Sequence, residues 1–206
     1  MKKIIAIVAF VAAMFVAGNA QAQMSVRFGY APETFTYSSF SENYNGFFAG
    51  VFNTFDLKNG LNFTPGVQAR YNMRSESVSL ATATRTTKDA QFLVEVPLAV
   101  SYGIALGNNL KISPFIGPMV TFALSGKSTI KDTESISGYT TTNTHDWYGD
   151  NSNLNRLNLS AMGGVNVKYV RLNLFAGYQM GLLDLNKSDN GTLKTSGYFI
   201  GLGYDL

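Results

Sequence analysis

A histidine and an aspartate stand side by side in the chain, and this pair is the first place to look for catalysis. His145 is the only histidine among the 206 residues, and Asp146 follows it. A histidine oriented by a carboxylate serves as the base of many hydrolases when a nucleophile lies within hydrogen-bond reach. Here the pair stands in a run of Thr, Asn, Ser and Gly. No serine is fixed beside it at strand spacing, so we interpret His145 as a solvated loop residue and expect no catalytic residue and no enzymatic activity.

Residues that could hold a metal or a phosphate are sparse. The chain has no cysteine, and one histidine cannot make a conventional zinc set. Asp146, Asp150 and Asn151 are close in sequence, but they lack the spacing of an EF-hand loop. The glycines recur along alternating stretches and form no phosphate-binding loop. We therefore expect no metal and no cofactor.

The first 22 residues have the layout of a secretory signal peptide. Lys2 and Lys3 precede an uncharged apolar run, and Ala20-Gln21-Ala22 supplies the small-x-small cleavage pattern. We predict cleavage after Ala22, which divides the chain into a signal peptide, 1–22, and one mature domain, 23–206.

The mature domain carries an almost even balance of charge. Without Lys2 and Lys3, 14 of the 16 Lys and Arg residues remain against 13 Asp and Glu. No Lys/Arg cluster could follow a phosphate backbone, so we expect no nucleic-acid partner. After residue 22 no run of about 18 apolar residues could form a transmembrane helix.

Period-two alternation of apolar and small or polar residues recurs along the mature domain. Between Thr195 and Leu206, for example, Tyr198, Ile200 and Leu202 share one face, and glycines dominate the other. Such alternation predicts strands of about 12–15 residues, longer than the 5–6 usual in soluble proteins and long enough to cross a membrane. The eight predicted strands are 24–37, 45–57, 61–75, 91–106, 110–124, 157–169, 171–183 and 195–206.

The predicted connections alternate between long and short. Asn59-Gly60 and Gly107-Asn108-Asn109 are tight turn signals, and the turn at 169–171 is also short. The long connections are 38–44, 76–90, 125–156 and 184–194. Short periplasmic turns and longer outer loops are typical of outer-membrane barrels. We therefore predict an all-β fold, an eight-stranded antiparallel up-and-down transmembrane β-barrel with both termini in the periplasm.

Aromatic residues lie near both ends of the predicted apolar faces. Rings favour the headgroup level of a membrane, where they form girdles. The predicted girdle residues are Phe47, Phe55, Phe63, Tyr71, Phe92, Tyr102, Tyr198 and Tyr204.

Charged residues alternate onto the opposite, inward face. Because unpaired charges in a narrow lumen are costly, they must pair with one another. We predict a network centred on Arg70 and Glu95, which lie at similar heights on neighbouring strands. A polar plug is favoured over a gated ion path. The predicted lumen charges are Arg27, Glu33, Arg70, Arg74, Glu95, Lys111 and Lys168.

The long polar segment 125–156 is the predicted recognition surface, because loops of about 30 residues are uncommon and usually functional or disordered. Its rings and histidine suit binding of an extracellular protein or glycan, and a surface loop without a partner is the alternative. The residues are Tyr139, His145, Trp147 and Tyr148.

Residues 201–206, Gly-Leu-Gly-Tyr-Asp-Leu, resemble the C-terminal strand that barrel-assembly machinery recognises. Leu206 departs from the pattern, because such strands often end in Phe. In layout, residues 23–206 resemble the PorT-like outer-membrane β-barrel domain proteins of Bacteroidetes, which are similar in architecture to OmpX- and OmpA-type barrels. The resemblance implies insertion by that machinery into the outer membrane of a Gram-negative cell, among lipid and lipopolysaccharide.

Together these features predict an integral outer-membrane protein with a structural or surface-interaction role, adhesion or recognition. Eight strands leave little lumen, so a general porin is not expected. Two alternatives remain. One is an outer-membrane enzyme that modifies lipid, as lipid A deacylases do with a His and a Ser. The other is a periplasmic lipocalin-like barrel, which would turn the apolar faces inward around an apolar ligand.

Overall fold

The computed structural model describes residues 22–38, 40–79, 82–134, 138–148, 152, 154–187 and 191–206, so the predicted signal peptide lies outside them except for Ala22. All regular structure in this part of the chain is β-strand, and it holds no helix long and apolar enough to cross a membrane. The strands are β1 (Ala22–Tyr30), β2 (Glu33–Tyr37), β3 (Phe40–Asp56), β4 (Leu61–Ser79), β5 (Ala83–Tyr102), β6 (Ile104–Ala105), β7 (Leu110–Glu134), β8 (Thr140–Asp146), β9 (Leu157–Tyr169), β10 (Leu172–Gly181) and β11 (Leu193–Asp205).

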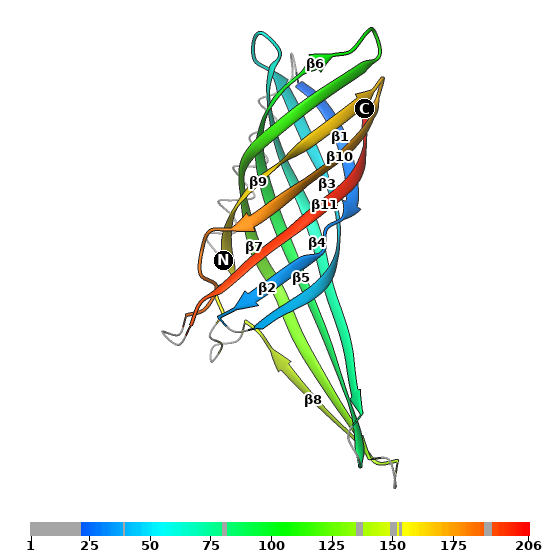
Figure 1. The fold of residues 1–206 in the computed structure, drawn as a ribbon, viewed down its shortest axis with the longest axis vertical. Coiled ribbons are helices and arrows are strands. Elements are labelled where there is room, and N and C mark those ends of the chain that lie inside the picture. The colour runs from blue at the N-terminus through cyan, green and yellow to red at the C-terminus, as the bar shows by residue number, and fades with distance from the viewer. Residues whose placement is uncertain are drawn as a thin grey trace.

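The strands pair into one closed antiparallel ring (Figure 1). The ring order is β1, β11, β10, β9, β7, β5, β4 and β3, and β3 pairs with β1 again. β1 and β2 act as one strand interrupted at Ala31 and Pro32, because both pair with β3 on one side and β11 on the other. Counted in this way, eight strands close the barrel, as predicted.

The outer surface of the barrel is apolar and its interior is mostly polar. Along β11, Tyr198, Ile200 and Leu202 are exposed, whereas Phe199 and Asp205 between and beyond them are buried. The lipocalin-like alternative is therefore wrong, because it requires the apolar faces to line the interior.

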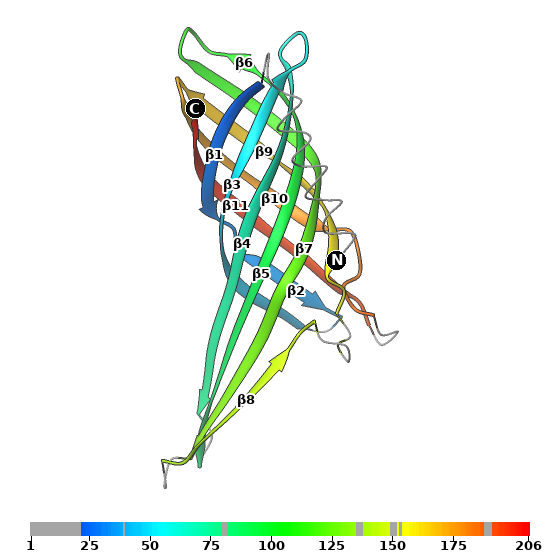
Figure 2. The ribbon, with the colours of Figure 1, turned by 180° about the vertical axis from the view of Figure 1, so that it is seen from behind.

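The short connections gather at one end of the barrel, together with the C-terminus (Figure 2). We call this the turn end and the opposite end the loop end. Asn59 and Gly60 have positive φ angles, 54° and 83°, as an Asn-Gly hairpin requires. Val170 also has a positive φ, 56°, which is unusual for a β-branched residue.

Three of the predicted long loops, 38–44, 76–90 and 125–156, are wrong, because most of their residues are strand. β3 already begins at Phe40. β4, β5 and β7 have 19, 20 and 25 residues and continue through 76–79, 83–90 and 125–134. β8 pairs with the far part of β7. The result is a four-stranded sheet that projects beyond the rest of the barrel at the loop end (Figure 1). We call residues 74–79, 83–90, 125–134 and 140–146 the projecting sheet.

Phenylalanine rings inside the barrel lie over glycines of the neighbouring strand. The ring of Phe52 covers Gly66, its cross-strand partner, so closely that a Cβ there would meet the ring at 2.3 Å. Four more cross-strand partners share this arrangement, and they place an aromatic layer across the lumen: Phe48 with Gly29, Phe115 with Gly164, Phe175 with Gly201 and Phe199 with Gly177.

Candidate functional site

A buried ion cluster occupies the middle of the lumen. The Nε of Arg70 lies 3.4 Å from Oε1 of Glu95, and its Nη1 lies 3.6 Å from Oε2 of Glu33. Arg70 also donates a hydrogen bond of 2.8 Å to Gln179 across the barrel. Gln68 donates to the second oxygen of Glu95. The side chains of Arg70 and Glu95 are each 1% exposed. The cluster therefore ties β2, β4, β5 and β10 together across the lumen.

Arg74 lies nearer the loop end, where it collects a second set of acidic partners. Its Nη1 is 2.5 Å from Glu42 and 3.8 Å from Asp89, and its Nη2 bonds Glu76. The guanidinium also lies over the ring of Tyr44, 5.8 Å from the centroid. These contacts link β3, β4 and β5 at the point where the projecting sheet begins.

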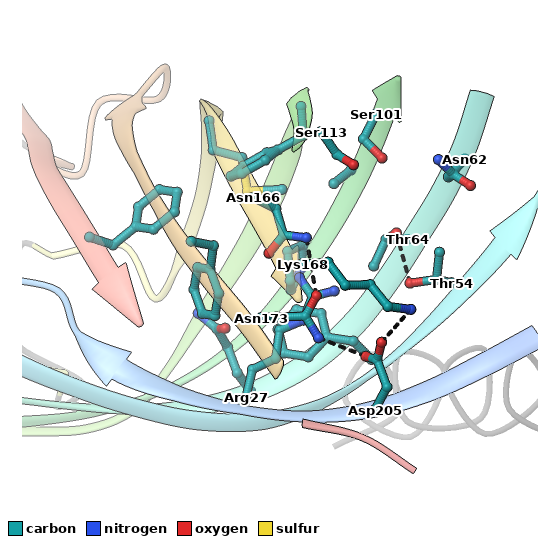
Figure 3. A pocket seen from close by; sticks show the side chains of 18 of the residues that line it. Arg27, Thr54, Asn62, Thr64, Ser101, Ser113, Asn166, Lys168, Asn173 and Asp205 are labelled. Carbon is teal, nitrogen blue, oxygen red and sulfur yellow. Dashed lines mark hydrogen bonds and ion pairs between the residues drawn. The ribbon is translucent and has the colours of Figure 1, made fainter. Parts of the chain in front are cut away.

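The turn-end half of the lumen holds a cavity of about 180 Å³ (Figure 3). Lys168 and Asp205 form an ion pair of 2.7 Å at its wall, and Asn173 donates to the same carboxylate. Arg27 stacks over Phe52, with 4.5 Å between its Cζ and the ring centroid, and Lys111 is also part of the lining. The aromatic layer and the Arg70 cluster stand between this cavity and the loop end.

Trp147 and Tyr148 fold back over the loop end of the barrel instead of pointing outward. The Trp147 ring packs edge-on against Tyr44 and Phe35, with centroids 5.8 and 6.5 Å apart. The hydroxyl of Tyr148 accepts a hydrogen bond from Gln91 inside the barrel. Burial raises the pKa of Tyr148 to about 12. These two residues of the predicted recognition set thus pack on the loop end of the barrel.

The other two members of the predicted recognition set, Tyr139 and His145, are exposed. Tyr139 directly precedes β8 of the projecting sheet, and His145 lies within it. His145 lies in β8, directly opposite Ser128 of β7. The expectations of a loop histidine and of no serine at strand spacing are therefore both wrong. Across the strands the order is Asp89 on β5, Ser128 on β7 and His145 on β8. The carboxylate is therefore the cross-strand neighbour of the serine and not of the histidine. Within the described ranges, no three His, Asp or Glu residues are grouped as metal ligands would be.

The predicted girdle residues all lie on the outer surface and are exposed or half-exposed. The ring of Phe47 packs at a tilt against that of Tyr30, with centroids 5.3 Å apart, and the ring of Phe55 stacks on that of Phe63, with centroids 6.5 Å apart. The others are Tyr71, Phe92, Tyr102, Tyr198 and Tyr204. Apolar side chains that would be unfavourable in water surround the barrel as a continuous belt, which fits contact with lipid.

The sequence also matches a known family. A family model described as "Outer membrane protein beta-barrel domain" matches residues 12–187. The chain belongs to this family. For a member of the outer membrane β-barrel family, the apolar belt and the closed ring of strands both have a direct explanation, and membership supports an outer-membrane location.

Solved structures similar to this outer membrane β-barrel protein are distant in sequence. Neisserial surface protein A has 16% identity and a TM-score of 0.48, with 90% of this chain and 99% of that one covered. Ail, the attachment invasion locus protein of Yersinia pestis, has 15% identity and a TM-score of 0.47 over the same shares. The outer membrane enzyme PagL has 12% identity and a TM-score of 0.42, covering 86% and 99%. No curated protein matches.

Sequence reasoning missed the projecting sheet and the phenylalanine–glycine layer of this outer membrane β-barrel protein. The recurring glycines at 163–164, 177, 181, 197, 201 and 203 were a usable signal for close approach of rings. The Ser/Thr alternation of 75–79 and 84–88 was a signal for strand. Neither pattern names the partner strand, so the register had to come from the structure.

Proposed function

We propose that this protein acts in recognition or adhesion at the cell surface through its projecting sheet, and that it is neither a general porin nor an enzyme. The length of β7 carries the proposal, because 25 residues extend to about 80 Å at about 3.3 Å per residue. The lumen, in contrast, holds the Arg70 cluster and the aromatic layer, and we infer that these side chains block the passage of solutes.

The outer surface indicates where the membrane ends. From Leu61 to Met73 the outward residues of β4 are mainly apolar, and from Ser75 onward they are serines. This apolar part is about 40 Å long along the strand, which is about 30 Å across the membrane at a tilt of about 40°. That height equals the hydrocarbon thickness of a bilayer. The projecting sheet then stands outside it.

We infer that the turn end faces the periplasm and the projecting sheet faces the cell exterior. Short periplasmic turns support this orientation. The inference also includes export by the N-terminal signal, engagement of barrel-assembly machinery by β11, and the Bacteroidetes PorT-like type. The alternation of glycines and apolar residues in 195–206 supports these last two.

Labelling of single cysteines tests the proposal cleanly, because the chain has no cysteine of its own. Thr142→Cys on β8 should react with a membrane-impermeant maleimide in intact cells. Asn108→Cys, in a turn, should react only after the outer membrane is permeabilised. Liposomes holding the purified protein should show no swelling in small sugars. The reverse labelling order, or sugar-driven swelling, would overturn the proposal.

A further inference from the structure

The outward face of the projecting sheet is a regular array of hydroxyl and lysine side chains. The antiparallel register aligns residues of β4, β5, β7 and β8 in rows across this face. The three outermost rows are Ser79–Thr84–Thr133–Thr140, Ser77–Thr86–Lys131–Thr142 and Ser75–Lys88–Thr129–Thr144. Hydroxyls of adjacent strands are close together, as in Ser77 and Thr86 at 3.0 Å and Thr133 and Thr140 at 3.2 Å.

Three lysines on this face surround one threonine. Lys88 lies directly opposite Thr129, and Lys127 and Lys131 are two residues before and after Thr129 on β7. Lys88 is therefore a diagonal neighbour of both Lys127 and Lys131, and such neighbours in an antiparallel sheet are about 7–8 Å apart. The long lysine side chains can therefore bring three ammonium groups around one ligand that the Thr129 hydroxyl also reaches.

The charge of this face is unbalanced. Among its aligned residues Asp146, opposite Lys127, is the one acidic group, and the described part of the chain gives none of the three lysines an ion pair within 4 Å. The reverse face differs, because there the Nε and Nη2 of Arg85 donate to the two carboxylate oxygens of Asp132, at 2.8 and 3.0 Å. The outward face thus has cationic groups without partners, whereas the reverse face supplies its own.

The array lies immediately beyond the apolar belt, on the same side of the strands. Along β4 the outward residues change from Met73 to Ser75, and along β5 they change from Phe92 through Ala90 to Lys88. The side that contacts lipid tails lower down therefore faces, higher up, the headgroups and sugars of the surrounding leaflet. Lysines attract anionic groups at such a membrane surface, and hydroxyls bond sugars and phosphate oxygens.

From these observations we propose that the outward face of the projecting sheet binds phosphate-bearing sugars of the glycolipid that surrounds the barrel in the outer leaflet. Lys88, Lys127 and Lys131 bind the phosphate, and Thr129 donates its hydroxyl to it. This proposal rests on the proposed function, because it requires the projecting sheet to lie outside the outer membrane.

Binding of a soluble probe to the purified full-length barrel in detergent micelles tests the proposal. The probe is deacylated lipopolysaccharide oligosaccharide, used with its phosphates and after phosphatase treatment. The intact probe should bind, and dephosphorylation should weaken binding on the order of 100-fold. The variant Lys88→Gln/Lys127→Gln/Lys131→Gln should lose a similar factor, since each lysine near an anionic surface contributes about fivefold. Replacing the same lysines by Arg should preserve binding.

Two controls separate the face from net charge and from folding. Lys58→Gln/Lys187→Gln/Lys194→Gln removes the same charge elsewhere and should leave binding unchanged. Thr129→Val keeps the strand shape and should weaken binding about fivefold. Every variant should retain the mobility shift between unboiled and boiled samples.

Three outcomes would overturn the proposal: equal binding of the two probes, equal losses in the two triple variants, and preference for a sulfated polysaccharide foreign to the outer leaflet. If Thr142→Cys is labelled in intact cells but no phosphate-dependent binding occurs, this inference fails and the proposed function stands. If Thr142→Cys is inaccessible, the proposed function fails with it.

Discussion

Arg70 on β4 and Glu95 on the neighbouring strand β5 meet in the middle of the lumen, with 3.4 Å between Nε and Oε1. Glu33 stands on the other side of the same guanidinium, at 3.6 Å. The guanidinium of Arg70 is therefore the shared counter-ion of two carboxylates, and all three side chains are buried. The stability of the barrel should depend strongly on this single side chain.

Arg70→Leu should lower the free energy of unfolding by about 3–5 kcal/mol, because two buried carboxylates lose their counter-charge. Urea titration in micelles, followed by gel mobility of unboiled samples, measures this change. Arg85→Leu, which breaks the exposed pair with Asp132, should leave the unfolding midpoint almost unchanged. A wild-type midpoint for Arg70→Leu would show that the cluster contributes nothing.

Gly66→Ala should destabilise the barrel by about 1–3 kcal/mol, because the new Cβ would meet the Phe52 ring at 2.3 Å. In a Phe52→Ala background the same substitution should cost little, since the space is then free. A double-mutant cycle of urea midpoints measures this coupling. Additive effects of the two substitutions would contradict direct packing of the ring on the glycine.

Val170→Asn should stabilise the protein by about 1 kcal/mol, because asparagine tolerates the left-handed φ of 56° better than a β-branched residue. The unfolding midpoint is the measurement, and Arg171→Asn, the next residue of the same turn, is the matched control. A lower midpoint for Val170→Asn would mean that valine makes a contact here that outweighs its backbone strain.

Tyr148 should ionise near pH 12, because burial at the loop end disfavours its phenolate. Its folded pKa lies above the ordinary value of about 10. The stability it contributes is therefore complete below pH 10 and is lost as the pH rises through 12. The measurement is an alkaline titration of tyrosinate absorbance. Subtracting the curve of Tyr148→Phe from that of the wild type isolates this one tyrosine among 11. Ionisation near pH 10 would show that residue 148 is in solvent.

The extended segments were misread because of their composition. Residues 76–90 and 125–146 carry mostly Ser, Thr, Lys and Asp, a composition typical of loops. Their described residues form strands because their backbones pair with one another beyond the rest of the barrel. Pairing of this kind needs no apolar face, so hydrophobic alternation could not reveal it.

The position of Trp147, the single tryptophan, could not be predicted from the sequence either. A ring in a polar segment is equally compatible with a surface contact and with packing on the barrel. Its direction was decided by Phe35 and Tyr44, which come from β2 and β3, more than 100 residues earlier in the chain.

The amino-acid sequence alone was enough to predict which residues form most strands, which residues share a face of each strand, and where the tight turns lie. These features follow from local rules: side chains alternate with period two, and Asn-Gly permits positive φ. The nearness of Arg70 and Glu95 also followed, since one strand-to-strand register relates them. The structure was needed to show which face of the strands lies outside, the projecting sheet, the rings over glycines, the packing of Trp147 and the lysine array. Each of these depends on how several strands pair and pack together, and no local pattern encodes that arrangement.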